Sequence, residues 1–397
     1  MGKAKRYVAL VAVLAVVALV VTGCGGSGAS TAGSGKVTVD IGIGAPLTQG
    51  ATALGQGMVR GATLAIDDVN ASADAKKLGI TFVGIQGDDQ GDPTKGVNVA
   101  NQFASDPKLV GVMGHLNSGV SIPASAVYQR ANIVMISPAS TNPQLTQLGR
   151  KNVFRVCTTD AVQGPVAADD AITKLGKKAV YVVDDSTPYG VGLADNFQAE
   201  FKTKGGTILG RDKTSDKDTD FKALVTKIKA TKPDLVYYGG IYNAGALLAK
   251  QLKDGGVTAP LMGGDGLYDP QFVVLAGAAN ANGDYATSVG LPLEQLPQGQ
   301  SFLKEFSAKY PNDKPAAYDA YSYDAAKVIM ESALVAAKSV GASSVTGTSG
   351  RQAIIAAVAA FHGAGITGDI AFDKNGDTTN KAITLYTVTN GVWGPVK

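Results

Sequence analysis

The chain has few residues whose spacing suits catalysis. A nucleophile elbow, a phosphate-binding glycine loop and a Cys-x-x-Cys pair are all absent from its 397 residues. The two histidines, His115 and His362, are far apart and have no histidine or cysteine partner at metal-ligand spacing. We therefore expect no metal site, no cofactor and no enzymatic activity. His115 is expected to be a hydrogen-bonded structural residue.

Small hydroxyl residues and glycines gather instead where apolar, strand-like runs end. Five segments have this character: Gly114–Ser121, Ser137–Thr141, Asp184–Gly190, Gly239–Asn243 and Gly263–Tyr268. Hydroxyls and backbone N–H groups at helix N-termini bind anions without a formal counter-charge. In open α/β sheets, ligands bind beyond the carboxyl ends of the strands. The pattern therefore favours binding of a small molecule.

Strands alternating with helices are needed to position these segments. Runs rich in Val, Ile and Tyr alternate with segments of helical periodicity, such as Gly57–Asn70, whose apolar residues share one face. This alternation predicts βαβ crossovers and parallel sheets. It occurs twice, over residues 37–157 and 158–287, and is followed by a helix-rich part and a last strand at Ala382–Thr389. The fold class is therefore predicted as α/β, with two Rossmann-like lobes.

The N-terminus predicts export. Three basic residues precede the uncharged run Tyr7–Val21, and Cys24 follows Val21-Thr22-Gly23. This order is typical of a lipoprotein signal peptide, here residues 1–23, with Cys24 as the lipidation site. The alternative is an uncleaved anchor helix, but the run is shorter than the roughly 20 residues that span a bilayer. Residues 24–36, rich in Gly and Ser, are expected to form a lipidated flexible tether.

Net charge and cysteine content indicate which partners and which disulfides can be expected. Residues 1–23 contain three basic residues and no acidic ones, which leaves 33 basic against 33 acidic residues in the mature chain. A neutral chain gives no reason to expect nucleic acid or an anionic membrane patch as a partner. Cys157 is the one cysteine besides Cys24, so we expect no disulfide. We expect Cys157 to be buried as a small apolar residue, with a reactive thiol as the alternative.

The loops resemble the branched-chain amino-acid-binding proteins of ABC transporters, the leucine/isoleucine/valine-binding type. The resemblance covers essentially the whole mature chain, and it depends on the order and spacing of several blocks together. These blocks are Gly42–Asn70, Asp88–Pro93, Gly114–Ser118, Ile136–Thr141, Gln163–Pro165, Tyr189–Ala194, Val236–Gly240 and Leu261–Gly266. It implies a type I periplasmic-binding-protein fold, two lobes joined by three hinge crossovers that close on the ligand.

The resemblance also implies which residues bind. In the family, the ligand α-carboxylate is held by a serine of a G-H-L-x-S loop, here Ser118, and by an [ST]-P-A-x-T loop. That loop corresponds to Ala139, Ser140 and Thr141. An acidic residue of the second lobe meets the α-ammonium, which implies Asp265. The tyrosine of the Y-G-x-G-L-A block, Tyr189, closes over the ligand.

Departures from the family concern the side-chain wall. Leu54 and Tyr318 stand where aromatic residues are common, and Ile241 replaces a frequent tyrosine, with Tyr242 next to it. Family members often have Glu in place of Asp265. Some relatives have a disulfide at the positions of Gly91 and Asn117, which is missing here.

Together these features predict a lipid-anchored, extracytoplasmic binding protein of an ABC importer, a monomer that delivers an amino acid to a membrane permease. The ligand is expected to be branched-chain or aliphatic. The alternative is a sensory receptor lobe, or a binding protein for a small amide, urea or aromatic acid. Crossovers are expected near Val156–Asp160, Asp284–Gly290 and Gly368–Phe372. The N-terminal lobe is then 37–157 plus 288–369, and the C-terminal lobe is 158–287 plus 370–397.

Overall fold

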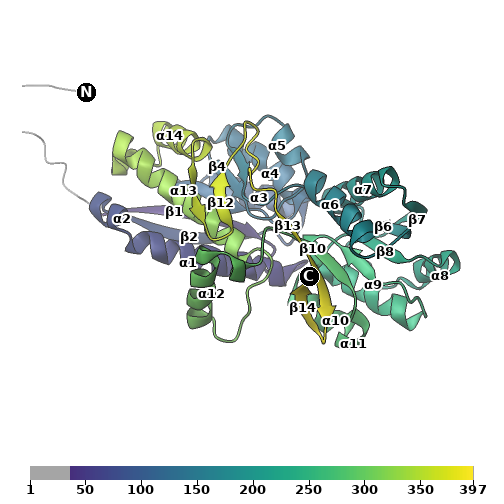
Figure 1. Ribbon diagram of the computed structural model, residues 1–397. Helices are drawn as coiled ribbons and strands as arrows, with labels where there is room; N and C mark the ends of the chain where they lie inside the picture. The colour runs from purple at the N-terminus through teal and green to yellow at the C-terminus, as the bar shows by residue number, and fades with distance from the viewer. Residues whose placement is uncertain (1–35, 397) are drawn as a thin grey trace, which may run out of the picture. The chain divides into compact units, whose positions relative to one another are not determined.

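The computed structural model describes residues 36–396 (Figure 1). The expected signal peptide, Cys24 and most of the expected tether therefore lie outside the described residues. No helix within 36–396 combines the length and apolar character needed to cross a membrane.

The first sheet is parallel throughout, with strand order β2-β1-β3-β4-β5. Its strands are β1 (Val37–Ala45), β2 (Ile80–Asp88), β3 (Leu109–Gly114), β4 (Val134–Ser137) and β5 (Val153–Arg155). Along β4, Val134 and Ile136 pack in one apolar cluster and Met135 packs in another. Because neighbouring side chains of a strand point to opposite faces, this sheet is covered on both sides.

The helices of the first lobe come from two separate parts of the chain. The first part supplies α1 (Thr52–Ala71), α2 (Ala73–Leu78), α3 (Pro93–Ala104), α4 (Ser118–Arg130) and α5 (Gln144–Gln147). The second supplies α12 (Pro297–Lys309), α13 (Asp319–Val340), η3 (Ala342–Ser344) and α14 (Thr348–Ala359). Helix α13 packs along α1, where a Cβ on Gly61 would lie 1.9 Å from the Asp319 carbonyl oxygen. Only glycine permits so close an approach.

The second sheet is mixed, with strand order β14-β13-β10-β9-β8-β6-β7. Five strands are parallel: β6 (Ala179–Asp184), β7 (Thr207–Lys213), β8 (Leu235–Gly239), β9 (Leu261–Gly263) and β10 (Tyr285–Val289). Strands β13 (Ile383–Thr389) and β14 (Val392–Pro395) extend it in antiparallel fashion.

The second lobe has its own helices. They are α6 (Asp160–Thr173), α7 (Pro188–Thr203), α8 (Lys222–Thr231), α9 (Tyr242–Asp254), η1 (Asp265–Leu267), α10 (Pro270–Ala276) and α11 (Ala278–Ala281). Figure 1 shows α6, α7 and α8 gathered around the second sheet, away from α13 and α14 of the first lobe. The α/β class with two lobes is therefore confirmed; the first sheet is parallel throughout, and the second is parallel except for β13 and β14.

Three connections join the lobes. They cover residues 156–159 between β5 and α6, residues 290–296 between β10 and α12, and residues 372–382 between β12 (Gly368–Ala371) and β13. The second contains η2 (Leu293–Gln295). The second and third connections both lie further along the chain than the positions expected for them, which are Asp284–Gly290 and Gly368–Phe372. Residues 285–289 pair with β13 along their whole length, so the chain leaves the second sheet only after Val289.

A short hairpin explains why the third connection begins later than expected. Strand β12 pairs with β11 (His362–Gly365), and the turn between them donates two backbone N–H bonds to Asp324 of α13. Further on, Arg155 N donates to Gly376 O at 2.9 Å, beside β5. Residues 370–376 thus remain with the first lobe, although the sequence assigned them to the second. Their partners lie far away in the chain, so local composition does not reveal them.

Candidate ligand-binding site

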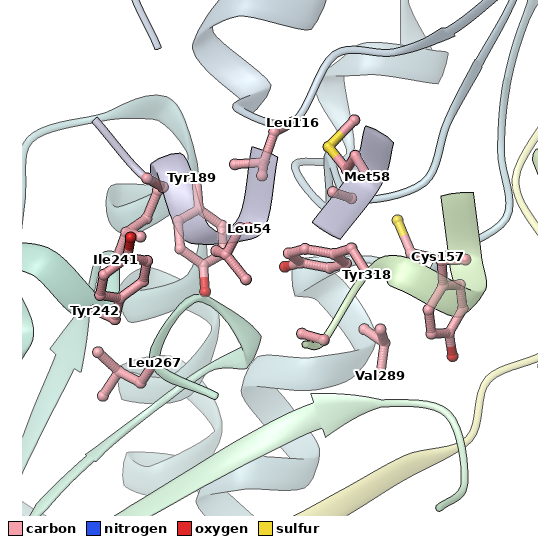
Figure 2. Packing of buried hydrophobic residues seen from close by; sticks show 14 of the residues in the cluster. Leu54, Met58, Leu116, Cys157, Tyr189, Ile241, Tyr242, Leu267, Val289 and Tyr318 are labelled. Carbon is pink, nitrogen blue, oxygen red and sulfur yellow. The ribbon is translucent and has the colours of Figure 1, made fainter. Parts of the chain in front are cut away.

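A small cavity lies where the carboxyl ends of the two sheets face each other. The space between its lining residues, including the part open to solvent, is about 270 Å³. Its lining comes from both lobes: Leu54, Leu116, Asn117, Ser118, Ala139, Tyr189, Ile241, Gly266 and Tyr318. Figure 2 shows Leu54 between Tyr189 and Tyr318, with Leu116 above them. These residues follow β3, β4, β6, β8 and β9 or belong to α1 and the start of α13, as expected for a site beyond strand ends.

Six of the nine residues expected to bind ligand line this cavity, namely Leu54, Ser118, Ala139, Tyr189, Ile241 and Tyr318. The other three, Ser140, Thr141 and Asp265, are fully buried behind it. Leu116, Asn117 and Gly266 complete the lining and were not expected. Each follows a strand by two or three residues and lies in Gly114–Ser121 or Gly263–Tyr268, two of the segments that the sequence favours for binding.

The serine hydroxyls of the first-lobe wall form a hydrogen-bonded network. Ser118, the first residue of α4, accepts a hydrogen bond from Asn142 N at 3.2 Å through its Oγ. Ser137 Oγ accepts from Ser140 N at 2.9 Å, and Ser140 Oγ lies 2.6 Å from Ser121 Oγ. Ser140 Oγ also donates to Leu116 O at 2.9 Å. The Ser140 hydroxyl is therefore used inside the loop, which leaves the backbone and Thr141 to face a ligand.

His115 is hydrogen-bonded to this wall and to two buried side chains behind it. Its ring nitrogens lie 2.7 Å from Asp89 Oδ2 and 2.9 Å from Tyr128 Oη, and its carbonyl oxygen accepts from Ser137 Oγ at 2.9 Å. All of these groups are buried. Full hydrogen bonding of buried polar groups is what a rigid loop requires. His115 thus has the structural role that its position between a strand and a helix suggests.

The second-lobe wall contains a buried carboxylate. Asp265 has no exposed surface; Tyr189 Oη donates to its Oδ1 at 2.9 Å and Tyr318 Oη to its Oδ2 at 2.5 Å. Burial raises the pKa of Asp265, and the two tyrosine hydroxyls counteract the rise. Tyr189 belongs to the second lobe, and Tyr318 directly precedes α13 of the first, so these bonds link both lobes at one carboxylate.

A second buried carboxylate, that of Asp160, was not predicted from the sequence. Asp160, the first residue of α6, is fully buried, and within residues 36–396 neither of its carboxylate oxygens has a hydrogen-bond partner. Burial, reinforced by the charge of Asp265, raises the pKa of Asp160 to about 8, although the nearby Thr141 hydroxyl and the positive charge of Arg155 counteract the rise. Thr141 Oγ1 and Gln163 Oε1 are also buried without partners in the described part of the chain. The only sequence signal for Asp160 is its place at the helix start after the first connection.

Tyr242 does not line the cavity, and its hydroxyl accepts from Ala53 N at 3.2 Å. This bond joins α9 to α1, next to Leu54. A second bond between the lobes runs from Asn142 Nδ2 to Pro188 O at 2.6 Å. The larger aliphatic residues that line the cavity, Leu54, Leu116 and Ile241, form its apolar wall.

Reactive groups are scarce around the cavity. Cys157 is buried behind it, and burial raises the pKa of its thiol. Among residues 36–396, no three His, Cys, Asp or Glu side chains are grouped so that they could hold a metal ion. The arrangement suits capture of a small zwitterion, with hydroxyls and backbone on one side and carboxylates on the other.

Comparisons with known proteins agree on one family. Residues 38–392 match the periplasmic binding protein family. Leu/Ile/Val-binding protein homolog 1 of Brucella melitensis is 33% identical, over 91% of this chain and 93% of its own. The leucine-binding protein LivK of Thermotoga maritima has a TM-score of 0.81 and 28% identity, over 90% of this chain and 98% of its own. LivJ of Streptococcus pneumoniae, solved with isoleucine, has a TM-score of 0.79 and 27% identity, over 91% of this chain and 99% of its own. The chain belongs to the periplasmic binding protein family, among the Leu/Ile/Val-binding proteins.

Proposed function

We propose that this protein is the lipid-anchored, extracytoplasmic binding component of an ABC importer, and that it binds a branched-chain or other aliphatic amino acid between its lobes. One observation carries the proposal: two fully buried carboxylates, Asp160 and Asp265, lie close to the cavity-lining tyrosines Tyr189 and Tyr318, and neither forms an ion pair within residues 36–396. Buried charges are costly unless paired. A ligand ammonium group would supply the missing positive charge.

The opposite wall suits the carboxylate of the same ligand. Ser118 Oγ, at the start of α4, and Thr141 Oγ1, after β4, offer hydroxyl donors. Helix N-termini favour negative charge. Between the two walls, Leu54, Leu116 and Ile241 would contact the ligand side chain. The wall has no charged group for a longer polar side chain, which favours an aliphatic amino acid.

Binding would stabilise the closed arrangement because the ligand contacts both lobes. Ser118 and Thr141 come from the first lobe, and Asp265 and Tyr189 from the second. A ligand shifts a conformational equilibrium only by its difference in affinity for the two states. The bond from Tyr318 to Asp265 already joins the lobes here, at 2.5 Å. A ligand ammonium would add to this bond or replace it.

Isothermal titration with a panel of solutes tests the ligand assignment. Leucine, isoleucine and valine should bind, whereas urea, acetamide and benzoate should not. The latter solutes have no ammonium group and would leave Asp265 and Asp160 without a positive partner. Binding of benzoate or an amide in preference to every amino acid would overturn the assignment and favour the alternative class of ligand.

The anchor requires a separate test, since Cys24 lies outside the described residues. Cells expressing the full chain should place the protein in the membrane fraction, with diacylglycerol on Cys24 detectable by mass spectrometry. Cys24→Ala should release the protein from that fraction. Recovery of wild-type protein free of lipid would contradict the anchor. Co-purification with a permease rather than a sensor kinase would favour transport over sensing, and sedimentation of the purified chain would test the expected monomer.

A further inference from the structure

Arg155 is the largest fully buried side chain of the molecule as described. It ends β5, directly before the first connection between the lobes. A buried guanidinium is tolerated only when its donors are satisfied and its charge is paired. Both conditions are met at Arg155, and the way they are met links the ligand-binding loop to the connections.

One edge of the guanidinium holds the loop after β4. Nη1 donates to Ser140 O at 2.7 Å and to Asn142 O at 2.8 Å. These two carbonyl groups flank Thr141. Nη2 donates to Thr146 Oγ1 at 2.7 Å, in α5. The backbone on either side of Thr141 is thereby fixed by one rigid, planar group.

The other edge holds the third connection. Nε donates to Asp377 Oδ1 at 2.6 Å, and Thr146 Oγ1 donates to the same oxygen at 2.9 Å. The backbone is attached at the same place, because Arg155 N donates to Gly376 O at 2.9 Å. Asp377 does not line the ligand cavity. Its effect on a ligand must therefore pass through Arg155 or Thr146.

We propose that Arg155 is a positioning residue for ligand capture: with Asp377, it holds residues 139–142 in the form that receives the ligand carboxylate and ties that loop to the first and third connections. The inference rests on the proposed function. The three guanidinium nitrogens of Arg155 donate to Ser140 O, Asn142 O, Thr146 Oγ1 and Asp377 Oδ1. Lysine carries the same charge but has only three N–H donors, all on one nitrogen, so it cannot hold this whole set together. Preorganised donors bind more tightly because the loop loses less freedom when the ligand arrives.

Arg155→Lys tests this with two ligands, leucine and leucinamide, which differ at the carboxylate. The variant should bind leucine about tenfold more weakly than the wild type, corresponding to the loss of about one charge-assisted hydrogen bond. Leucinamide, which lacks the carboxylate charge, should change by less than about twofold. The preference for leucine over leucinamide should therefore shrink. A general loss of packing would weaken both ligands alike.

Asp377→Asn provides a second, milder variant if Arg155→Lys does not fold. It keeps the side-chain shape and removes the charge from the far end of the link, so leucine should again weaken more than leucinamide. Arg351→Lys is the matched control. Arg351 donates to the carbonyls of Ala131 and Asp106, at the opposite end of α4 from Ser118. This control should bind both ligands like the wild type.

Hydrogen exchange of the ligand-free protein adds a readout that needs no ligand. Arg155→Lys should speed exchange in residues 139–146 selectively, whereas Arg351→Lys should not. Equal loss of both ligands, or leucine affinity within twofold of the wild type in a folded variant, would overturn the inference. If the wild type binds no amino acid, the proposed function fails, and unchanged exchange in 139–146 would then separately remove the positioning role.

Discussion

The two walls of the cavity differ in how completely their polar groups are satisfied. On the first lobe, Ser137, Ser140 and His115 bond one another in a closed network. On the second lobe, Asp160 has no hydrogen-bond partner within residues 36–396, and Asp265 has only two tyrosine hydroxyls. The comparison indicates that the two walls have different roles in binding. The serine network of the first-lobe wall is complete before the ligand arrives, with Thr141 Oγ1 left without a partner within residues 36–396, whereas the carboxylate wall needs a cation from outside the chain.

Removal of Asp265 should have the largest effect. Asp265→Ala should weaken leucine binding by at least about a hundredfold, or about 3 kcal/mol, because the ligand ammonium loses its nearest carboxylate. Isothermal titration measures the change. Asp254→Ala is the control, since Asp254 forms an exposed pair with Lys250. Affinity within threefold of the wild type would place the ammonium elsewhere and break the comparison.

Asp160 should make the ligand-free protein less stable as the pH rises. Its pKa is raised to about 8 in the fold, from an ordinary 3.8. Between these values the folded chain holds a proton that the unfolded chain has lost, so the free energy of unfolding falls with increasing pH. The contribution is at most about 1.4 kcal/mol per pH unit.

Urea unfolding of the wild type and Asp160→Asn at pH 5, 6, 7 and 8 measures this effect. The difference between the two proteins isolates Asp160 from other buried carboxyl groups, such as Asp284 and Asp319, whose pKa values are raised to about 7. The variant should lose less stability than the wild type across the range. If the free energies of unfolding of the two proteins changed with pH in parallel, the pKa of Asp160 would not be raised in the fold.

The same residue should strengthen leucine binding at alkaline pH. A ligand ammonium favours ionised Asp160, so binding should release a proton at pH 7. Asp160→Asn should bind leucine about tenfold more weakly at pH 8, with little pH dependence between 6 and 8. Titrations in buffers of different ionisation enthalpy count the protons released. Equal proton release by both proteins would remove Asp160 from the binding wall.

Loss of a single hydroxyl from the complete wall should have the smallest effect. Ser118→Ala should weaken leucine binding by about fivefold, corresponding to about one hydrogen bond. Ser125→Ala in the same helix is the control, because Ser125 Oγ donates to Ile122 O and does not line the cavity. If Ser118→Ala were as damaging as Asp265→Ala, the contrast between the walls would be wrong.

Much of this arrangement could be predicted from the sequence because it depends on local patterns. Alternating strands and helices give the two lobes, and the segments after the strands give Ser118, Ala139 and Tyr189 as neighbours. Even Gly91 and Asn117, the positions at which the resemblance implies a disulfide in some relatives, lie close together: a Cβ on Gly91 would lie 3.4 Å from Asn117 Oδ1.

The remainder depends on contacts between distant parts of the chain. Strand β10 continues to Val289 because it pairs with β13, almost a hundred residues later. Residues 370–376 stay with the first lobe because of partners such as Arg155. Asp160 occupies an ordinary position at a helix start, and only the folded structure shows that it is buried without a partner. Burial is a property of the assembled fold, which spacing alone does not encode.

The central claim is that the ligand provides the cation missing from the carboxylate wall. Isothermal titration of the wild-type protein with leucine and with 4-methylpentanoate, the same molecule without its amino group, tests it most directly. We predict that leucine binds and that 4-methylpentanoate binds at least about a hundredfold more weakly. Equal affinity for the two would contradict the account, because the buried carboxylates would then have no part in recognition.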